Sequence, residues 1–78
     1  MRFVEITWLD HNEAEGSTWM TVAEAAAKPL STCTSIGYLI AEHDDRYVLS
    51  SSLVRGEDTV ARPLVIAKAA VLKVRNLR

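Results

Sequence analysis

Residues 32–41 read TCTSIGYLIA, a run rich in β-branched and aromatic residues with a glycine, Gly37, inside it. This composition is typical of a β-strand, in which Ile36, Tyr38 and Ile40 share one face. A glycine in mid-strand costs stability, so we expect Gly37 to mark a bulge or a sharp bend where a small sheet curls over. The run therefore predicts that the chain folds around a curved β-sheet.

Further strands are predicted on both sides of this run. Residues 43–46 (HDDR) read as a tight turn, which makes the run and the strand after it a hairpin. Residues 67–70 (AKAA) have room for one tight helical turn before the last strand. The other four strands are expected at residues 2–10, 47–54, 64–66 and 71–75. In the first of them Val4, Ile6 and Trp8 share one face, which we expect to lie in the core.

One α-helix is predicted between the first strand and the second. Thr21 and Glu24 have the spacing of a capping box, in which each side chain satisfies a free backbone amide of the other residue, and Pro29 stops the helix. A helix of about two turns does not hold without tertiary contacts. We therefore expect its apolar face to dock on the rest of the domain; this face consists of Val22, Ala25 and Ala26.

The composition predicts one small domain over residues 1–78. The chain has a mass of 8.6 kDa and is 49% hydrophobic and 24% charged, so it is too short for two cores and too apolar to be disordered. A domain of this size has a marginal core. Disulfides cannot support it, because Cys33 is the sole cysteine, and one Cys with two His falls short of a common structural zinc site. Association with copies of itself is the remaining support.

Five short strands and one small helix would leave both edges open in a flat sheet, with its apolar face uncovered. Curling into a small barrel solves both problems. We therefore predict a mainly β fold, a five-stranded small barrel with one short helix between strands 1 and 2. The alternative is an α+β arrangement in which the helix lies on one face of an open sheet.

Two segments resemble the signatures of Sm-like proteins. Residues 37–39 (GYL), the acidic pair Asp44 and Asp45, and residues 48–49 are similar to the first signature. Residues 66–74 (IAKAAVLKV) are similar to the second, in which apolar residues flank a one-turn helix before the last strand. The resemblance implies an Sm-like (SH3-like) barrel that forms rings and binds RNA.

The polar residues of these signatures differ from those of the RNA-binding Sm-like members. Tyr47 stands nearest to the position where they carry Asn after the hairpin turn, a position that faces the pore of Sm-like rings. Lys68 is followed by Ala69, where they have a basic residue followed by glycine, or Lys followed by His.

Most of the chain also resembles short uncharacterised proteins encoded by bacteriophages. The similarity lies in residues 4–10 (VEITWLD), Trp19, residues 35–40 (SIGYLI) and residues 63–66 (PLVI). It implies a phage or prophage origin, and it names no activity.

No segment reads as a membrane span, which needs roughly 18 apolar residues, and the N-terminal residues alternate without a signal-peptide core. We therefore expect a cytoplasmic protein, in the host cytoplasm if it is phage-encoded. The net charge of −1 is unevenly divided: residues 1–53 carry −5 and residues 54–78 carry +4. An anionic ligand is expected on the C-terminal part.

The sequence predicts no enzyme and neither metal nor cofactor. Cys33 lies between two threonines, without a signature that pairs it with His11 or His43. Serines 50–52 lack a nucleophile elbow, and there is no glycine-rich phosphate loop. The acidic and histidine side chains at residues 42–45 are sequence neighbours in a hairpin turn, where a solvated turn is favoured over a metal site.

A ligand site is predicted from cations and aromatic rings. Lys73 and Arg75 alternate on the last strand, opposite Leu72 and Val74, so both point away from the core. They read either as charges that protect an edge strand or as part of a phosphate-binding stripe. The candidate ligand-binding residues are Trp19, Tyr47, Arg62, Lys68, Lys73 and Arg75.

These observations favour a non-enzymatic homo-oligomeric ring that binds a nucleotide-type, phosphate-bearing small molecule and sequesters a host defence signal. A net charge of −1 suits a small ligand better than a nucleic-acid polymer, which needs a broad basic surface. The alternatives are an Sm-like RNA-binding protein and a structural or adaptor subunit of a phage particle.

Overall fold

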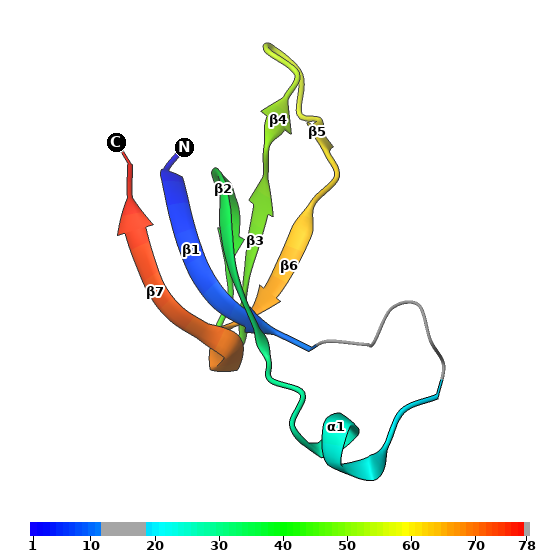
Figure 1. Ribbon diagram of the computed structural model, residues 1–78. Coiled ribbons are helices and arrows are strands. Elements are labelled where there is room, and N and C mark those ends of the chain that lie inside the picture. Colours follow the sequence, from blue (N-terminus) through cyan, green and yellow to red (C-terminus); the bar gives the residue numbers. More distant parts are fainter. Residues whose placement is uncertain (12–18, 78) are drawn as a thin grey trace.

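The computed structural model describes residues 1–11 and 19–77, and these residues are mainly β. Five antiparallel strands form one sheet in the order β6-β3-β2-β1-β7, and β4 and β5 form a second, two-stranded sheet (Figure 1). The strands are β1 (Phe3–Asp10), β2 (Ser31–Glu42), β3 (Arg46–Ser50), β4 (Ser52–Leu53), β5 (Val60–Ala61), β6 (Leu64–Ala67) and β7 (Val71–Asn76). The helical elements are α1 (Val22–Ala26), between β1 and β2 as predicted, and the one-turn 3-10 helix η1 (Lys68–Ala70), directly before β7 as predicted.

The five-stranded sheet is strongly curved and open. Its edge strands are β6 and β7, which η1 connects in sequence (Figure 1). The middle strand is β2, and β1 lies between β2 and β7. The β4–β5 ribbon continues the hairpin of β3 and β6 beyond the sheet (Figure 1). The two edge strands therefore expose backbone hydrogen-bonding groups on one side each.

The core is small and lies on the inner face of the curve. Val4, Ile6, Leu49 and Ile66 are fully buried. The predicted core position of Val4 and Ile6 is confirmed. Partly buried apolar side chains pack around these four residues: Trp8, Leu39, Tyr47, Val71 and Val74.

The register of β1 and β2 shows which face of β2 points to the core. Val4 lies opposite Gly37 and Ile6 opposite Ser35, so these positions of β2 share the inner face. Ile36 is 51% exposed and points to the other face, as does Tyr38, whose ring contacts that of Phe3 at a centroid distance of 5.1 Å. Ile36 and Tyr38 share one face, as predicted, and this is the outer face of the sheet. The inner face is set by a serine and a glycine, whose hydrophobicity does not mark it.

Gly37 is required by a close approach rather than by a bulge at its own position. A Cβ atom at Gly37 would lie 2.7 Å from the backbone oxygen of Ser50. The register of β2 and β3 shifts between Leu39 and Ala41, two residues further along. The predicted bulge therefore exists in this strand, but the glycine serves the contact between β2 and the end of β3.

The predicted strand over residues 47–54 is interrupted at Ser51, which divides it into β3 and β4. The buried Ser50 hydroxyl lies 2.9 Å from the carbonyl oxygen of Ser52 and 2.5 Å from that of Ala61. This hydroxyl thus lies within hydrogen-bonding distance of backbone carbonyls at the point where the chain stops pairing with β2, after β3, and begins to pair with β5, in β4.

The helix is shorter and more exposed than predicted. The backbone N–H of Glu24 donates to Thr21 Oγ1 at 3.1 Å, so the predicted N-cap is confirmed. No residue of α1 is buried, and Val22 is 86% exposed. The predicted docking of this face, and with it an α+β arrangement that covers the sheet, is therefore wrong for the described residues. None of the described helices is long and apolar enough to cross a membrane.

Candidate functional site

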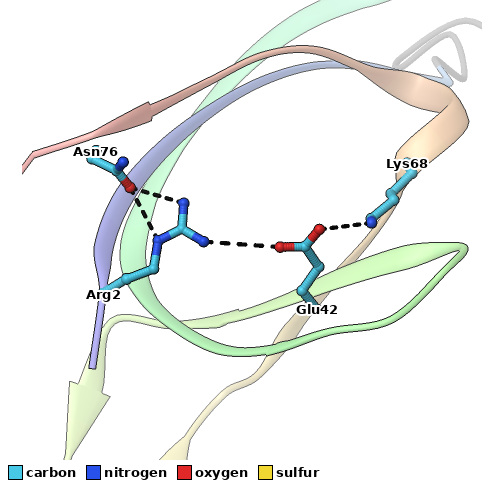
Figure 2. Close-up of polar contacts among 4 residues, drawn as sticks. All are labelled: Arg2, Glu42, Lys68 and Asn76. Atoms are coloured by element: carbon cyan, nitrogen blue, oxygen red, sulfur yellow. Dashed lines mark hydrogen bonds and ion pairs between the residues drawn. The ribbon is translucent and has the colours of Figure 1, made fainter.

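A row of four polar side chains lies on the inner side of the curved sheet (Figure 2). Arg2 Nε and Nη2 donate to Asn76 Oδ1 at 3.1 and 2.9 Å, and Arg2 Nη1 lies 3.9 Å from Glu42 Oε1. Lys68 Nζ donates to the other Glu42 oxygen, Oε2, at 2.8 Å. This inner row connects β7, the residue before β1, the end of β2 and η1 through side chains.

Each member of the inner row is placed by local structure. Arg2 lies two residues before Val4 and shares its face, and the Arg2 carbonyl accepts the Leu39 N–H at 2.8 Å. The one-turn helix η1 begins at Lys68, whose backbone N–H donates to the Asp45 carbonyl at 2.8 Å. That bond fastens η1 to the β2–β3 turn and directs Lys68 toward Glu42.

The charges of the inner row shift each other's ionisation. The hydrogen bond from Lys68, with the positive charges of Lys68 and Arg2, lowers the pKa of Glu42 below its ordinary value. The same hydrogen bond raises the pKa of Lys68. Lys68 Nζ also lies 5.0 Å from the centre of the Tyr47 ring, a cation–π distance. The structure thus brings together Tyr47 and Lys68, two of the six predicted site residues, and it neutralises Lys68 with a carboxylate.

The last strand carries two predicted cations on its outer side. Lys73 lies opposite Thr7 and Arg75 opposite Glu5, and Arg75 Nη2 donates to Glu5 Oε2 at 3.0 Å. Both cations are exposed and the intervening Val74 packs on the core, as predicted. Leu72, expected on the core side, is exposed, because the register of β1 and β7 shifts between Thr7 and Trp8.

Arg62 lies at the connection between β5 and β6, beside a hollow of about 280 Å³. Its φ angle of 48° is left-handed, a conformation that costs a non-glycine residue about 1–3 kcal/mol. The hollow is lined by Ser35, Ile36, Leu49, Ser51, Arg62 and Leu64. Within the described part of the chain Arg62 has neither an ion pair nor a side-chain hydrogen bond, which distinguishes it from Arg2, Arg46, Arg75 and Lys68.

Trp19 lies outside these groups. It precedes α1 and is 88% exposed, so its ring is not part of the core of the described residues. The six predicted residues therefore lie on several elements, and the described part of the chain shows a contact between two of them, Tyr47 and Lys68.

A second, larger hollow of about 570 Å³ lies beneath the β4–β5 turn. It is lined by Met1, Tyr38 and residues 51–60, so it combines Arg55 with the carboxylates of Glu57 and Asp58. Sequence reasoning did not single out this hollow.

No known family, curated protein or solved structure matches this chain. The similarity to Sm-like and bacteriophage proteins stays a prediction from the residues quoted for it.

The inner row contains three residues that sequence reasoning did not assign to a site, Arg2, Glu42 and Asn76. Arg2 entered the sequence reasoning only in the net charge of residues 1–53, although its even-numbered position, shared with Val4 and Ile6, places it on the inner face. Glu42 was assigned to a solvated turn. The turn cluster is divided in the structure: Glu42 points to Lys68, while Asp45 pairs with Arg46 at 2.6 Å. In residues 1–11 and 19–77 no three His, Cys, Asp or Glu side chains are grouped to hold a metal.

Proposed function

We propose that the protein is a non-enzymatic, phage-encoded binding protein that assembles from several copies and takes up a nucleotide-type ligand bearing phosphate. The observation that carries the proposal is the open sheet with two unpaired edges, β6 and β7, around a core of four buried hydrophobic residues. A core this small gives a marginal fold, and an unpaired edge is a template for another strand.

The edges have the composition of contact surfaces. Val65 on β6 is 58% exposed and Leu72 on β7 is 59% exposed. Pairing of β6 in one copy with β7 in the next removes both edges and covers these side chains. Because the two strands differ, the contact is heterologous, and it gives a closed ring when the rotation between copies is right. In this arrangement each copy forms an Sm-like barrel, and pockets arise where copies meet.

The ligand class follows from the cations outside the inner row. Arg62 and Lys73 are exposed and have no carboxylate partner in the described part of the chain. A few such cations per copy suit a small phosphate-bearing molecule, whereas a polymer needs a continuous basic surface.

Native mass spectrometry of protein extracted from cells tests this proposal. We expect an oligomer that carries a nucleotide-sized mass, or that gains one when cyclic nucleotides are added. A monomer that binds none of them contradicts the proposal.

A second candidate function is RNA binding of the Sm-like type. It is favoured by η1, a one-turn helix between apolar residues directly before β7, which is the arrangement that the resemblance implies. Filter binding with uridine-rich and adenine-rich oligomers at low salt separates the two functions. Retention of oligomers that weakens steeply with salt supports the RNA-binding function, and no retention ends it.

A further inference from the structure

We infer that the hollow at Arg62 is the phosphate subsite of this protein, and that it binds the phosphate group of a mononucleotide-sized ester. The inference rests on the proposed function and assigns the atoms that recognise the ligand. It also adds two residues that sequence reasoning did not consider, Ser35 and Ser51.

The lining of the hollow offers hydrogen-bond donors and no negative charge. Its polar side chains are Arg62, Ser35 and Ser51, and none of its six residues is acidic. Ser35 Oγ accepts a hydrogen bond from Trp8 Nε1 at 3.0 Å, which leaves the Ser35 hydroxyl proton free to donate. A guanidinium with two hydroxyls is a donor set that suits the oxygens of a phosphate.

Three other cations of the described chain, Lys68, Arg75 and Arg55, lie beside carboxylates. Lys68 is bound to Glu42, and Arg75 is bound to Glu5. Arg55 lies in the larger hollow beside Glu57 and Asp58, whose carboxylates repel an anion. Arg62 is thus the described cation that combines a hollow with the absence of a carboxylate.

The backbone at Arg62 supports the same assignment. A φ angle of 48° is left-handed, and the following Pro63 restricts this residue further. A glycine would adopt this conformation without strain. Arg62 therefore does not stabilise its own backbone, and without an intramolecular partner its side chain does not stabilise a neighbour either. Strain of this kind is characteristic of binding sites, where the surrounding structure holds a side chain in place for a ligand.

The size and apolar part of the hollow define the ligand. A volume of about 280 Å³ holds a phosphate and part of the group that it esterifies. Ile36 and Leu64 are exposed, so they offer an apolar surface to a sugar or base that extends outward. A mononucleotide such as AMP has both parts, whereas adenosine lacks the phosphate.

Titration followed by backbone amide NMR tests the subsite with inorganic phosphate, AMP and adenosine as probes. We expect phosphate and AMP to shift the amides of Ser35, Ile36, Ser51 and Leu64, with AMP binding more tightly and adenosine without effect. Arg62→Gln should weaken AMP binding at least about tenfold, which corresponds to the loss of a charge-assisted hydrogen-bond pair. Lys28→Gln removes an exposed charge of the same sign outside the hollow and should bind as the wild type does.

Arg62→Gly separates a binding role from a structural one. Because glycine adopts the left-handed conformation without strain, this variant should melt at the same temperature as the wild type or higher, yet lose AMP. A lower melting temperature with AMP binding retained shows that Arg62 is structural and overturns the assignment.

Three further outcomes overturn the subsite. The first is wild-type affinity in Arg62→Gln, and the second is amide shifts confined to β7. The third is equal binding of phosphate and AMP, which indicates an adventitious ion only. If oligomers extracted from cells carry a nucleotide but the amides around the Arg62 hollow do not shift, the subsite is wrong and the proposed function stands. If AMP binds at Arg62 to a protein that is monomeric and extracted empty, the subsite stands and the proposed assembly fails.

Discussion

Val4 in β1 and Val22 in α1 are the same type of residue, yet the first is fully buried and the second is 86% exposed. β1 has a hydrogen-bonded strand on each side, and its inner face meets side chains from β3 and β6. The described hydrogen bonds of α1 lie within its own turn and at the Thr21 cap, and none of its residues is buried. Burial in this molecule therefore follows from strand pairing, and α1 contributes no side chain to the buried core.

The strongest test of this comparison replaces the two valines by the same residue. Val4→Ala should lower the free energy of unfolding by about 2 kcal/mol, from lost burial and the cavity left behind. Val22→Ala should change it by less than about 0.5 kcal/mol, because an exposed alanine suits a helix. Urea unfolding followed by tryptophan fluorescence measures both, and equal losses would show that α1 packs in solution.

The two glycines with described surroundings extend the comparison to the backbone. Gly37→Ala should cost about 1–3 kcal/mol, because its Cβ would overlap the Ser50 carbonyl, a backbone atom that cannot move aside. Gly56→Ala, in the turn between β4 and β5, meets no atom within 4 Å and costs only the strain of φ +79°, about 1 kcal/mol. Thermal melts of both variants check the order. A larger loss of stability for Gly56→Ala than for Gly37→Ala would contradict this order, and it would show that the β4–β5 ribbon unfolds together with the five-stranded sheet.

The inner row gives a smaller, pH-dependent effect. The pKa of Glu42 is lowered by folding, so its stabilising contribution is present above the ordinary value of 4.5 and is lost as the pH falls through the folded pKa. The pKa of Lys68 is raised, so its contribution is present below 10.5 and is lost as the pH rises through the folded pKa. The melting temperatures of the wild type and Glu42→Gln should therefore differ most between pH 4.5 and 10.5. They should converge in acid, where Glu42 is protonated and loses its charge. A constant difference across acidic pH would contradict the pairing.

The smallest effect is expected at the cap of α1. Thr21→Ala removes the acceptor for the Glu24 N–H and should weaken the helix locally by about 1 kcal/mol. The global melting temperature should stay unchanged, since no residue of α1 is buried. Faster hydrogen exchange at Glu24 and Ala25 with an unaltered melt supports this, and a lower melting temperature contradicts it.

The elements of the fold could be predicted because each carries a local signal. The capping pair before α1, the polar turn after β2 and the alternation in β1 are readable within a few residues of sequence. The inner face of β2 could not be predicted in this way. Ser35 and Gly37 occupy it because β1 pairs in that register and β3 approaches closely, and both causes lie outside the strand.

The candidate site was predicted less well, for a related reason. Charge and residue type identified Lys68 and Arg75, but not their carboxylate partners. Glu42 and Lys68 are 26 residues apart, and Glu5 and Arg75 are 70 apart. Which cation is neutralised depends on the folded arrangement, and only the structure distinguishes Arg62 from the others.

The pairing of β1 with β7 has a consequence for synthesis of the chain. Val4 lies opposite Asn76, so β1 meets its second neighbour, β7, only after all the strands between them have been translated. Closing so long a segment is slow compared with forming the hairpin of β2 and β3, whose turn closes over four residues. On the ribosome, β1 therefore waits with one side unpaired, and a nascent chain arrested before residue 71 should stay sensitive to protease.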